Sequence, residues 1–292
     1  MKKFLSLLSM LVLCLSLAAP GISYAATIKL NKTSLTLYEG NTYTLKLTGT
    51  TKTVKWSTSN KTVATVTSKG KITAVKAGKA TITASVSTKK YTCKLTVKES
   101  FNAKKAIDSI DADVQDLGTG LVATLKNNYS FNFQMTATAV FYDSDGKMLG
   151  KSTADNYYFE KGRSCALYFY GPYDSNYSPV EYDSYKISYS VDAVSEYITS
   201  NVSDIKTNSN IGADNVMVEA TNSGDKESEY TCVSIVFYKG DVVVGYDYTY
   251  VDVSSPGSTN YADFSFPYDS DYNTIQIDNY KVYVNYSYNY TW

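Results

Sequence analysis

The sequence predicts an all-β protein that contains three β-sandwich domains in tandem after a cleaved signal peptide. Three observations support this fold class. Short runs of alternating apolar and polar residues recur between glycines along the chain. No stretch of residues 27–98 has the 3.6-residue period of an amphipathic helix. The later part of the chain also repeats itself, and the 292 residues are enough for two or three domains.

Residues 1–25 have the features of a secretory signal peptide. Lys2 and Lys3 form a basic start, an apolar run extends from Phe4 to Ala19, and small residues precede a cleavage point at Ala25. The apolar run has roughly 16 residues, fewer than the ~20 that span a membrane. We therefore expect a mature chain without a membrane span that is secreted, extracellular or associated with the cell surface.

Residues 26–98 form the first predicted sandwich. Apolar side chains alternate with Thr, Lys and Ser, which places one set on a buried sheet face. The clearest cases are Leu35 and Leu37, Leu45 and Leu47, Ile82 and Ala84, and Cys93, Leu95 and Val97. Trp56 lies on the same face as Val54, so we expect it in the core rather than stacked on a ligand.

Several short motifs, in matching order and spacing, make residues 27–98 similar to the bacterial Ig-like domain of group 2. These motifs are Leu37–Gly40, Val54–Asn60, Val63–Val66, Gly70–Val75, Ala77–Thr83 and Cys93–Val97. The resemblance implies an Ig-like sandwich in an exported bacterial or phage protein, a group that includes adhesins. It also implies use as a spacer beside other domains, and it transfers no catalytic residues.

The chain beyond a polar junction at 99–105 is an internal duplication. The matching segments lie 95 or 96 residues apart, at 139–142 and 235–238, 171–177 and 266–272, and 182–187 and 277–282. Gly162 and Gly257 mark a turn that both copies share. We therefore expect two related sandwiches, at 106–194 and 195–292, each near the ~100 residues of an Ig-like domain.

The first repeat resembles FxLYD-type domains at three short motifs. Asn127 stands in a turn, Phe141–Asp143 ends a long strand, and Gly146 forms the following hairpin turn. The second repeat departs from this pattern, because Lys239 takes the place of the aspartate. The resemblance implies a sandwich fold in exported bacterial proteins without an established catalytic set.

The composition argues against catalysis and nucleic-acid binding. The chain has no histidine, which removes the usual general base and zinc ligand, and Arg163 is its only arginine. The 28 basic and 28 acidic residues balance, and no lysine-rich patch attracts phosphates. We expect no enzyme, no cofactor and no nucleic-acid partner.

Neither the cysteines nor the acidic turn predicts a metal site. Cys93, Cys165 and Cys232 lie in strand-like runs and are expected to be buried thiols, without a Cys165–Cys232 disulfide between the repeats. The segment 143–146, DSDG, lacks the distal acidic ligands of a calcium loop and is interpreted as a hairpin turn.

Tyrosine is the compositional anomaly, with 29 residues against 10 phenylalanines. Exposed tyrosine faces would offer apolar area and a hydroxyl to a cell-wall or host glycan, or to a surface protein. Buried ones would be ordinary cross-strand packing. The candidate ligand-binding residues are Tyr246, Tyr248 and Tyr250 on one strand face, and Tyr173, Tyr177, Tyr268 and Tyr272 in the duplicated turns. We predict adhesion or binding through these residues, and the alternative is a structural spacer of the cell envelope without its own ligand.

Overall fold

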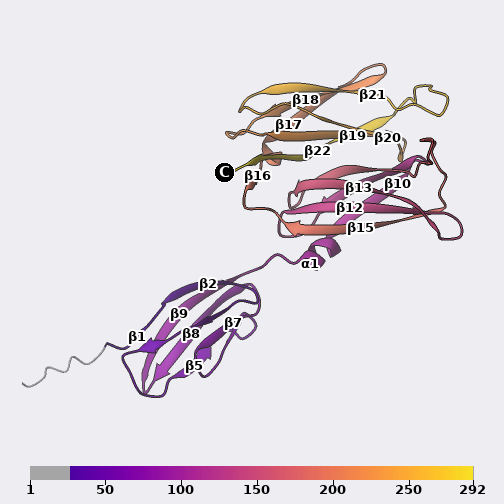
Figure 1. Ribbon diagram of the computed structural model, residues 1–292. Helices are drawn as coiled ribbons and strands as arrows, with labels where there is room; N and C mark the ends of the chain where they lie inside the picture. The colour runs from indigo at the N-terminus through magenta and orange to yellow at the C-terminus, as the bar shows by residue number, and fades with distance from the viewer. Residues whose placement is uncertain (1–26, 292) are drawn as a thin grey trace, which may run out of the picture. The chain divides into compact units, whose positions relative to one another are not determined.

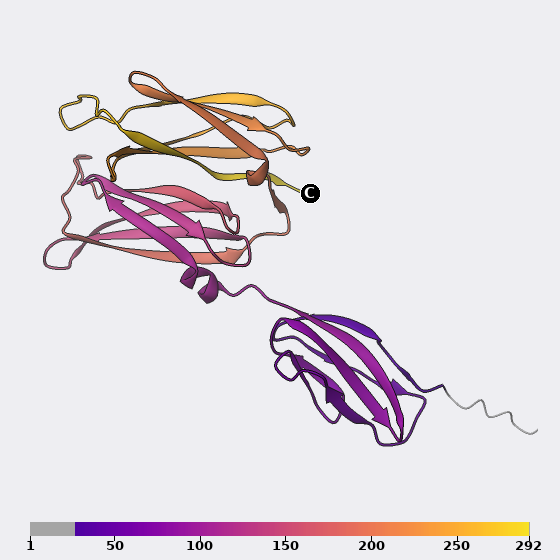
Figure 2. The same cartoon turned by 180° about the vertical axis from the view of Figure 1, so that it is seen from behind.

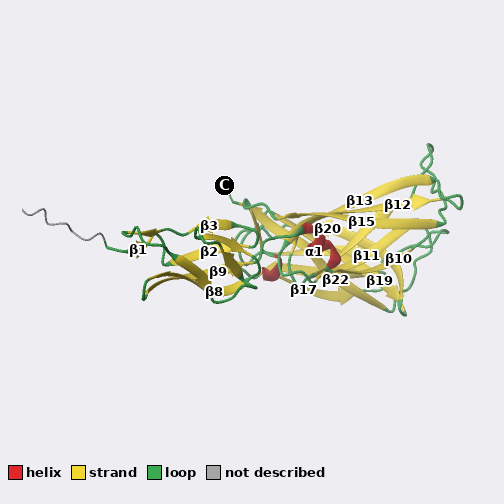
Figure 3. Ribbon diagram, turned by 90° about the horizontal axis from the view of Figure 1, so that it is seen from below, coloured by secondary structure: helices red, strands yellow, loops and turns green. Residues whose placement is uncertain are grey.

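A computed structural model describes residues 27–291, so the predicted signal peptide lies outside the described residues. The chain divides into two compact units between Ser100 and Phe101. Nearly all regular structure in 27–291 is β-strand, as the colouring of Figure 3 shows. Within that range no helix is long and apolar enough to cross a membrane. The prediction of an all-β fold is therefore confirmed.

The first unit is a sandwich of short strands (Figure 1). Its largest sheet has the order β2 (Ser34–Tyr38), β9 (Lys89–Lys98), β8 (Gly78–Val86) and β5 (Lys55–Thr58). A second sheet has the order β3 (Thr42–Thr44), β7 (Lys71–Ala74) and β6 (Ala64–Val66). A two-stranded sheet pairs β1 (Lys29–Leu30) with β4 (Leu47–Thr48). Strand β2 runs parallel to β9, and the other pairs are antiparallel.

The core of the first unit follows the predicted alternation. The buried side chains include Ile82 and Ala84 from β8 and Leu95 and Val97 from β9. Trp56 is half-buried and packs against this core. Gly70 lies directly under the indole in the left-handed region, with φ of 80°, and a Cβ there would be 2.9 Å from the ring. Both the close contact and the backbone conformation therefore require glycine at this position.

The second unit begins with a short helix. Helix α1 (Ala103–Asp108) starts after Asn102, whose side chain accepts a hydrogen bond from the Lys105 amide at 2.9 Å. Just before it, the Phe101 ring packs edge-on against Tyr129, with centroids 5.9 Å apart. Part of the predicted junction thus belongs to the second unit, because Phe101 contributes to its core.

The first repeat consists of two three-stranded antiparallel sheets. One sheet has the order β10 (Ile110–Asp116), β11 (Gly120–Asn127) and β14 (Ser164–Tyr170). The other has the order β13 (Met148–Phe159), β12 (Phe133–Tyr142) and β15 (Ser184–Ala193). Phenylalanines that are almost fully buried, among them Phe133, Phe141 and Phe169, fill the space between the two sheets.

The second repeat has the same topology with one added edge strand. Its first sheet has the order β17 (Ile205–Ile211), β18 (Asn215–Asn222) and β21 (Thr259–Ser265). Its second sheet has the order β16 (Ile198–Ser200), β22 (Asn279–Tyr290), β19 (Tyr230–Lys239) and β20 (Val242–Tyr250), and a 3-10 turn η1 (Val202–Asp204) follows β16. Strands β17 to β22 therefore correspond to β10 to β15 in order.

A buried asparagine marks the same turn in both repeats. The Asn127 side-chain amide donates to the Phe159 carbonyl at 2.9 Å, and that of Asn222 donates to the Val253 carbonyl at 3.2 Å. Both asparagines are fully buried, so each amide is paired where water cannot replace the bond.

The two repeats pack against each other through unlike sheets (Figures 1 and 2). The outer face of β10–β11–β14 contacts the outer face of the β16–β22–β19–β20 sheet. Val122 and Ala166 from the first repeat form one apolar cluster with Val236 and Val243 from the second. Strand β19 is consequently buried on both faces from residue 231 to 237, whereas its counterpart β12 alternates between buried and half-buried.

Candidate functional site

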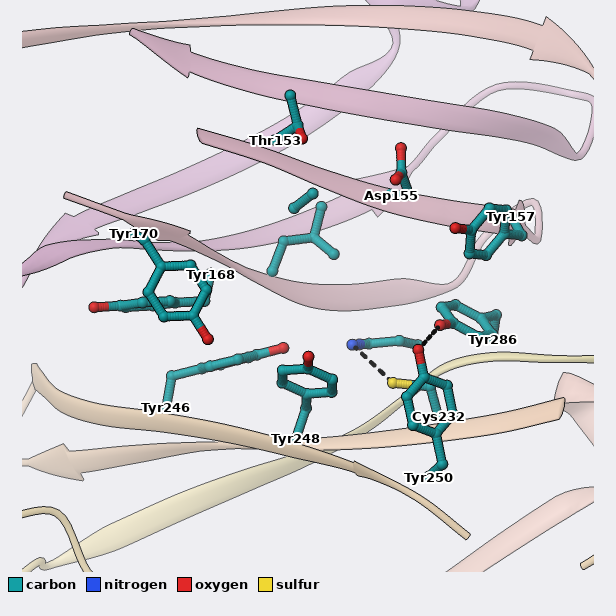
Figure 4. Close-up of a pocket in the computed structure, with 13 residues that line it drawn as sticks. Thr153, Asp155, Tyr157, Tyr168, Tyr170, Cys232, Tyr246, Tyr248, Tyr250 and Tyr286 are labelled. Atoms are coloured by element: carbon teal, nitrogen blue, oxygen red, sulfur yellow. Dashed lines mark hydrogen bonds between the residues drawn. The ribbon is translucent and has the colours of Figure 1, made fainter. Parts of the chain in front are cut away.

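A cleft lined by tyrosines runs along the junction between the two repeats. Two hollows form it, with volumes of about 200 Å³ and about 690 Å³, and they share Tyr157, Tyr250 and Tyr286. Strands β13 and β14 of the first repeat and β20 and β22 of the second supply most of its wall (Figure 4). We call this cleft the tyrosine groove, which comprises Tyr157, Tyr168, Tyr170, Tyr230, Tyr246, Tyr248, Tyr250, Tyr286, Tyr288 and Tyr290.

Strand geometry explains how so many rings meet here. Successive residues of a strand point to opposite faces, so Tyr246, Tyr248 and Tyr250 of β20 all project from the face that meets the first repeat. Strand β22 contains a bulge, because Cys232 pairs with Tyr286 while Val233 pairs with Val284. The extra residue changes which alternate positions of β22 face outward.

The rings form a continuous aromatic chain. Tyr168 and Tyr246 stack across the repeat junction, with centroids 5.7 Å apart and planes inclined by 10°. From Tyr246 the contacts continue along β20 through Tyr248 to Tyr250, at 6.2 Å for each step. Tyr250 then contacts Tyr286 at 6.4 Å, which joins the two hollows. Such spacings are those of favourable aromatic pairs, so the groove is a packed structure as well as an open surface.

The groove has a buried floor and an exposed rim. Tyr286 and Tyr288 retain only 5% and 6% of their accessible surface. On the rim, Tyr248 is 46% exposed and Tyr250 is 60% exposed, and Tyr157, Tyr170 and Tyr230 are likewise exposed. The rim therefore presents ring faces and hydroxyls to the cleft while the floor fixes their positions.

The hydroxyls of Tyr246 and Tyr286 in the groove stay protonated over the ordinary pH range. The Tyr250 and Tyr286 hydroxyls share a hydrogen bond of 2.9 Å, and the Tyr246 hydroxyl donates to the Ala166 carbonyl at 3.2 Å. Burial raises the pKa of Tyr286, and the hydrogen bond from Tyr250 adds to that rise. Burial also raises the pKa of Tyr246. These groups are therefore neutral hydroxyls that can both donate and accept.

Asn285, the extra residue of the β22 bulge, ties the two repeats together beneath the groove. Its side-chain oxygen accepts from the Ala166 amide at 2.9 Å, and its side-chain nitrogen donates to the Ala166 carbonyl at 2.8 Å. The Ser234 hydroxyl donates to the same Asn285 oxygen at 3.0 Å. Asn285 thus satisfies two backbone groups on the free edge of β14, as a neighbouring strand would do.

The charged groups that line the groove are all carboxylates. Asp155 lines the smaller hollow, and Glu229 and Asp252 line the larger one. Among the described lining residues there is no lysine or arginine. Burial raises the pKa of the Tyr157 hydroxyl, and the negative charge of Asp155 raises it further.

The seven predicted ligand-binding residues lie in two separate places. Tyr246, Tyr248 and Tyr250 belong to the groove. The other four belong to two matching turns, in which Tyr177 and Tyr272 are each 87% exposed. The structure therefore brings three of the seven together and leaves Tyr173, Tyr177, Tyr268 and Tyr272 outside the groove.

The duplicated turns are built on aspartate side chains. Asp174 Oδ1 accepts from the amides of Asn176 and Ser178 at 2.8 and 2.9 Å, and Asp269 makes the matching pair in the second repeat. The tyrosine inside each turn is left-handed, with φ of 61° at Tyr177 and 62° at Tyr272. The turns are therefore the same Asx-type structure twice.

Both turns lie at one end of the second unit. In the first repeat, the pairing of Tyr142 with Ser184 places loop 171–183 beside the β12–β13 hairpin turn. Loop 266–278 occupies the corresponding place in the second repeat. A hydrogen bond from the Val243 amide to Gln115 Oε1, at 3.1 Å, joins these ends of the two repeats.

Sequence reasoning missed most of the groove. The predicted set lacks Tyr157, Tyr168, Tyr170 and Tyr230, and it lacks the groove tyrosines of β22. One signal was available: the run CVSIVF at 232–237 is apolar on both strand faces, which indicates that a second layer covers the sheet. Tyr283 has an odd number, whereas Tyr286, Tyr288 and Tyr290 have even numbers. In a regular strand they would face opposite sides, and the bulge between them changes that alternation.

The described cysteines are free and buried. Cys165 is fully buried, and burial raises its pKa from 9.0 to about 12. Burial likewise raises the pKa of Cys232 to about 12. Among residues 27–291 no group of three or more acidic, Cys or His side chains could hold a metal ion. In the acidic turn, Asp143 Oδ1 accepts from the Lys147 amide at 2.8 Å, which closes the hairpin.

Comparison with known proteins gives one family match, which covers part of the chain. No curated protein matches the chain. Among solved structures, domains 5–6 of the S-layer protein SbsC share 16% identity over 77% of this chain and 96% of that one, with a TM-score of 0.22. Domains 1–6 of SbsC share 14% identity over 77% of this chain and 25% of that one, with a TM-score of 0.23. Activated Escherichia coli alpha-2-macroglobulin shares 9% identity over 73% of this chain and 25% of that one, with a TM-score of 0.19. Residues 25–104 match the family model of the bacterial Ig-like domain (group 2), which confirms the prediction for the first unit.

Proposed function

We propose that this chain is an exported, surface-associated binding protein without catalytic activity, which holds a glycan in the tyrosine groove. The bacterial Ig-like segment supports the exported, surface-associated setting, since that family occurs in such proteins. The observation that carries the binding role is the cleft of half-exposed tyrosines between the repeats. The resemblance of residues 106–292 to FxLYD-type domains stays a prediction.

Tyrosine suits a sugar for physical reasons. The apolar face of a pyranose ring can stack on an aromatic ring, while its hydroxyls find partners in the phenolic hydroxyls nearby. The rim residues Tyr248 and Tyr250 offer both features, and the buried floor holds them in place. A preorganised surface loses little conformational entropy when it binds, which favours affinity.

A structural spacer of the cell envelope is the competing function. The ring-to-ring contacts of the groove favour it, because they could serve only to join the repeats. In that case the tyrosines stabilise the second unit and recognise nothing. The two functions make different predictions for the rim, because only the binding function requires its tyrosines for contact with a ligand.

Binding to a glycan array and co-sedimentation with purified cell walls would test the proposal. The test variant is Tyr248→Ala with Tyr250→Ala, and the matched control is Tyr177→Ala with Tyr272→Ala, which removes two exposed tyrosines outside the groove. We expect saturable binding by the wild type and the control. The groove variant should lose about five- to 150-fold in affinity, since each of the two stacked rings is worth about 0.5–1.5 kcal/mol. Loss in the control alone would move the site to the turns. No binding by the wild type would favour the spacer.

A further inference from the structure

The chemistry of the groove also restricts which glycan it can take. The tyrosine faces favour neutral or cationic sugars only weakly, so the charged groups beside them contribute most of the discrimination by charge. Asp155 lies at one hollow and Glu229 and Asp252 at the other, and Asp192 lines a third hollow that shares Asp155 and Tyr157 with the groove. All four carboxylates belong to exposed residues.

No positive charge on the described walls offsets these carboxylates. A polymer that carries carboxylate, sulfate or phosphate groups would therefore bring like charges together in the cleft. Within a Debye length of about 8 Å at physiological salt this repulsion acts on every repeat unit of such a ligand. An acidic glycan is the wrong partner for this surface.

The hydrogen-bonding capacity of the walls points in the same direction. A carboxylate only accepts hydrogen bonds, so its free oxygen lone pairs need donors from the ligand. Asp155 Oδ1 already accepts from the Thr136 hydroxyl at 2.6 Å, which ties the carboxylate to strand β12. An ammonium group supplies three donors and a positive charge, and its attraction to tyrosine faces adds a cation–π contribution.

A proline-rich peptide fits less well. Proline lacks a backbone donor, and the polyproline conformation presents mainly carbonyl acceptors to an aromatic groove. The carboxylates here would then lack partners along most of the bound segment. A sugar chain instead carries donors on every ring, so it can pair with the carboxylates and with the phenolic hydroxyls at once.

We propose that the tyrosine groove binds a linear polysaccharide whose sugars carry free amino groups, such as a polymer of glucosamine. This inference rests on the proposed function, because it names the ligand class of the same site. The pyranose faces stack on the rim tyrosines, and the protonated amines lie against Asp155, Glu229 and Asp252. The N-acetylated form of the same polymer keeps the rings but loses the charge, so it binds more weakly.

Calorimetric titration of the full chain would test this inference with three oligosaccharides of equal length. These are a glucosamine oligomer, its fully N-acetylated form and an oligomer of galacturonic acid, each at a pH at which the sugar amine is protonated. We expect the glucosamine oligomer to bind about three- to thirtyfold more tightly than the acetylated one, from two or three exposed charge pairs. Its affinity should fall when NaCl is raised from about 0.05 to about 0.5 M. The acidic oligomer should not bind.

A charge-removal variant separates the contribution of the carboxylates from that of the rings. Asp155→Asn, Glu229→Gln and Asp252→Asn together should reduce the affinity for the glucosamine oligomer to that for the acetylated one. The control changes Glu181→Gln, Asp225→Asn and Asp271→Asn, which removes the same net charge from exposed residues outside the groove walls.

The possible contrary results are distinguishable. Equal affinity for the amino and acetylated oligomers, or an equal loss in both charge variants, would overturn the choice of an amino sugar and leave glycan binding in place. Binding of a lysine- and proline-rich peptide but of no oligosaccharide would overturn both. No binding of any probe, including the cell-wall material, would also overturn the proposed function.

Discussion

Removal of the Asn285 side chain should loosen the junction between the two repeats. In Asn285→Ala the Ala166 amide loses its acceptor and the Ser234 hydroxyl loses the oxygen to which it donates. The Ala166 carbonyl still accepts from the Tyr246 hydroxyl at 3.2 Å. One buried backbone donor is therefore left without its partner, at a position where Asn285 itself is only 5% exposed.

The cost can be worked out from these contacts. An unsatisfied buried amide costs about 1–3 kcal/mol, and the Ser234 hydroxyl can rotate to limit its own loss. The small void left by the missing carboxamide adds about 1 kcal/mol. We therefore expect the free energy of unfolding of the second unit to fall by about 2–4 kcal/mol, which is a large part of the stability of an ordinary domain.

Urea denaturation of the full chain would measure this loss, and amide hydrogen exchange would locate it. Exchange should accelerate in peptides from β14 and β22 and stay unchanged in peptides from β8 and β9 of the first unit. The matched control is Asn279→Ala in the same strand, an exposed asparagine whose loss should change stability by no more than about 0.5 kcal/mol. If Asn285→Ala behaved like that control, Asn285 would not couple the repeats.

Three further outcomes follow from particular positions. Gly70→Ala should destabilise the first unit by several kcal/mol, because the new Cβ would lie 2.4 Å from a backbone carbonyl oxygen. Gly40→Ala meets open space, so it should cost only the ~1–2 kcal/mol of a left-handed residue. Thermal unfolding of both variants would compare the two losses. Cys165 and Cys232 should resist iodoacetamide near pH 8 until the chain unfolds, as peptide mapping would show. Their raised pKa values mean that the folded chain keeps protons that the unfolded chain releases, so this contribution to stability is present below pH 9 and is lost as pH rises toward about 12. Tyr272→Asn should leave stability unchanged or raise it by up to about 1 kcal/mol, because asparagine tolerates a φ of 62°. Tyr272→Val should lower stability, because a β-branched residue disfavours that φ. Urea denaturation of both variants would measure the difference.

Local patterns carried the prediction of each sandwich. The alternation in β8 and β9 identifies the buried residues because a strand with one covered face needs an apolar residue at every second position. The order of motifs around Trp56 identified the bacterial Ig-like segment, and the family model confirms it. The shared turns reflect the duplication, since Asn127 and Asn222 hold them with the same side-chain bonds.

The groove could not be predicted in the same way, because it depends on how two sandwiches meet. Tyr246, Tyr248 and Tyr250 share a face in any strand, but alternation does not say what that face contacts. Tyr168 comes from a strand of the other repeat, and the two rings stack only because Asn285 and the apolar cluster fix the repeats together. A bulge in β22 decides which tyrosines of that strand reach the groove, and one unpaired residue leaves only a weak mark on the sequence.

The duplicated repeats form a single tyrosine groove because the outer face of β13 in the first repeat differs from the outer face of β20 in the second. The junction joins unlike sheets, and a heterologous contact of this type can repeat from one molecule to the next. The corresponding face of the first repeat no longer suits it: Lys151, Thr153 and Asp155 stand on β13 where β20 has Tyr246, Tyr248 and Tyr250. Burying charged and hydroxyl groups without partners costs free energy, so this face stays hydrated and does not form a second aromatic junction. Asp155 also lines the smaller hollow of the groove, so the same divergence that ends the stack places a carboxylate beside the tyrosines.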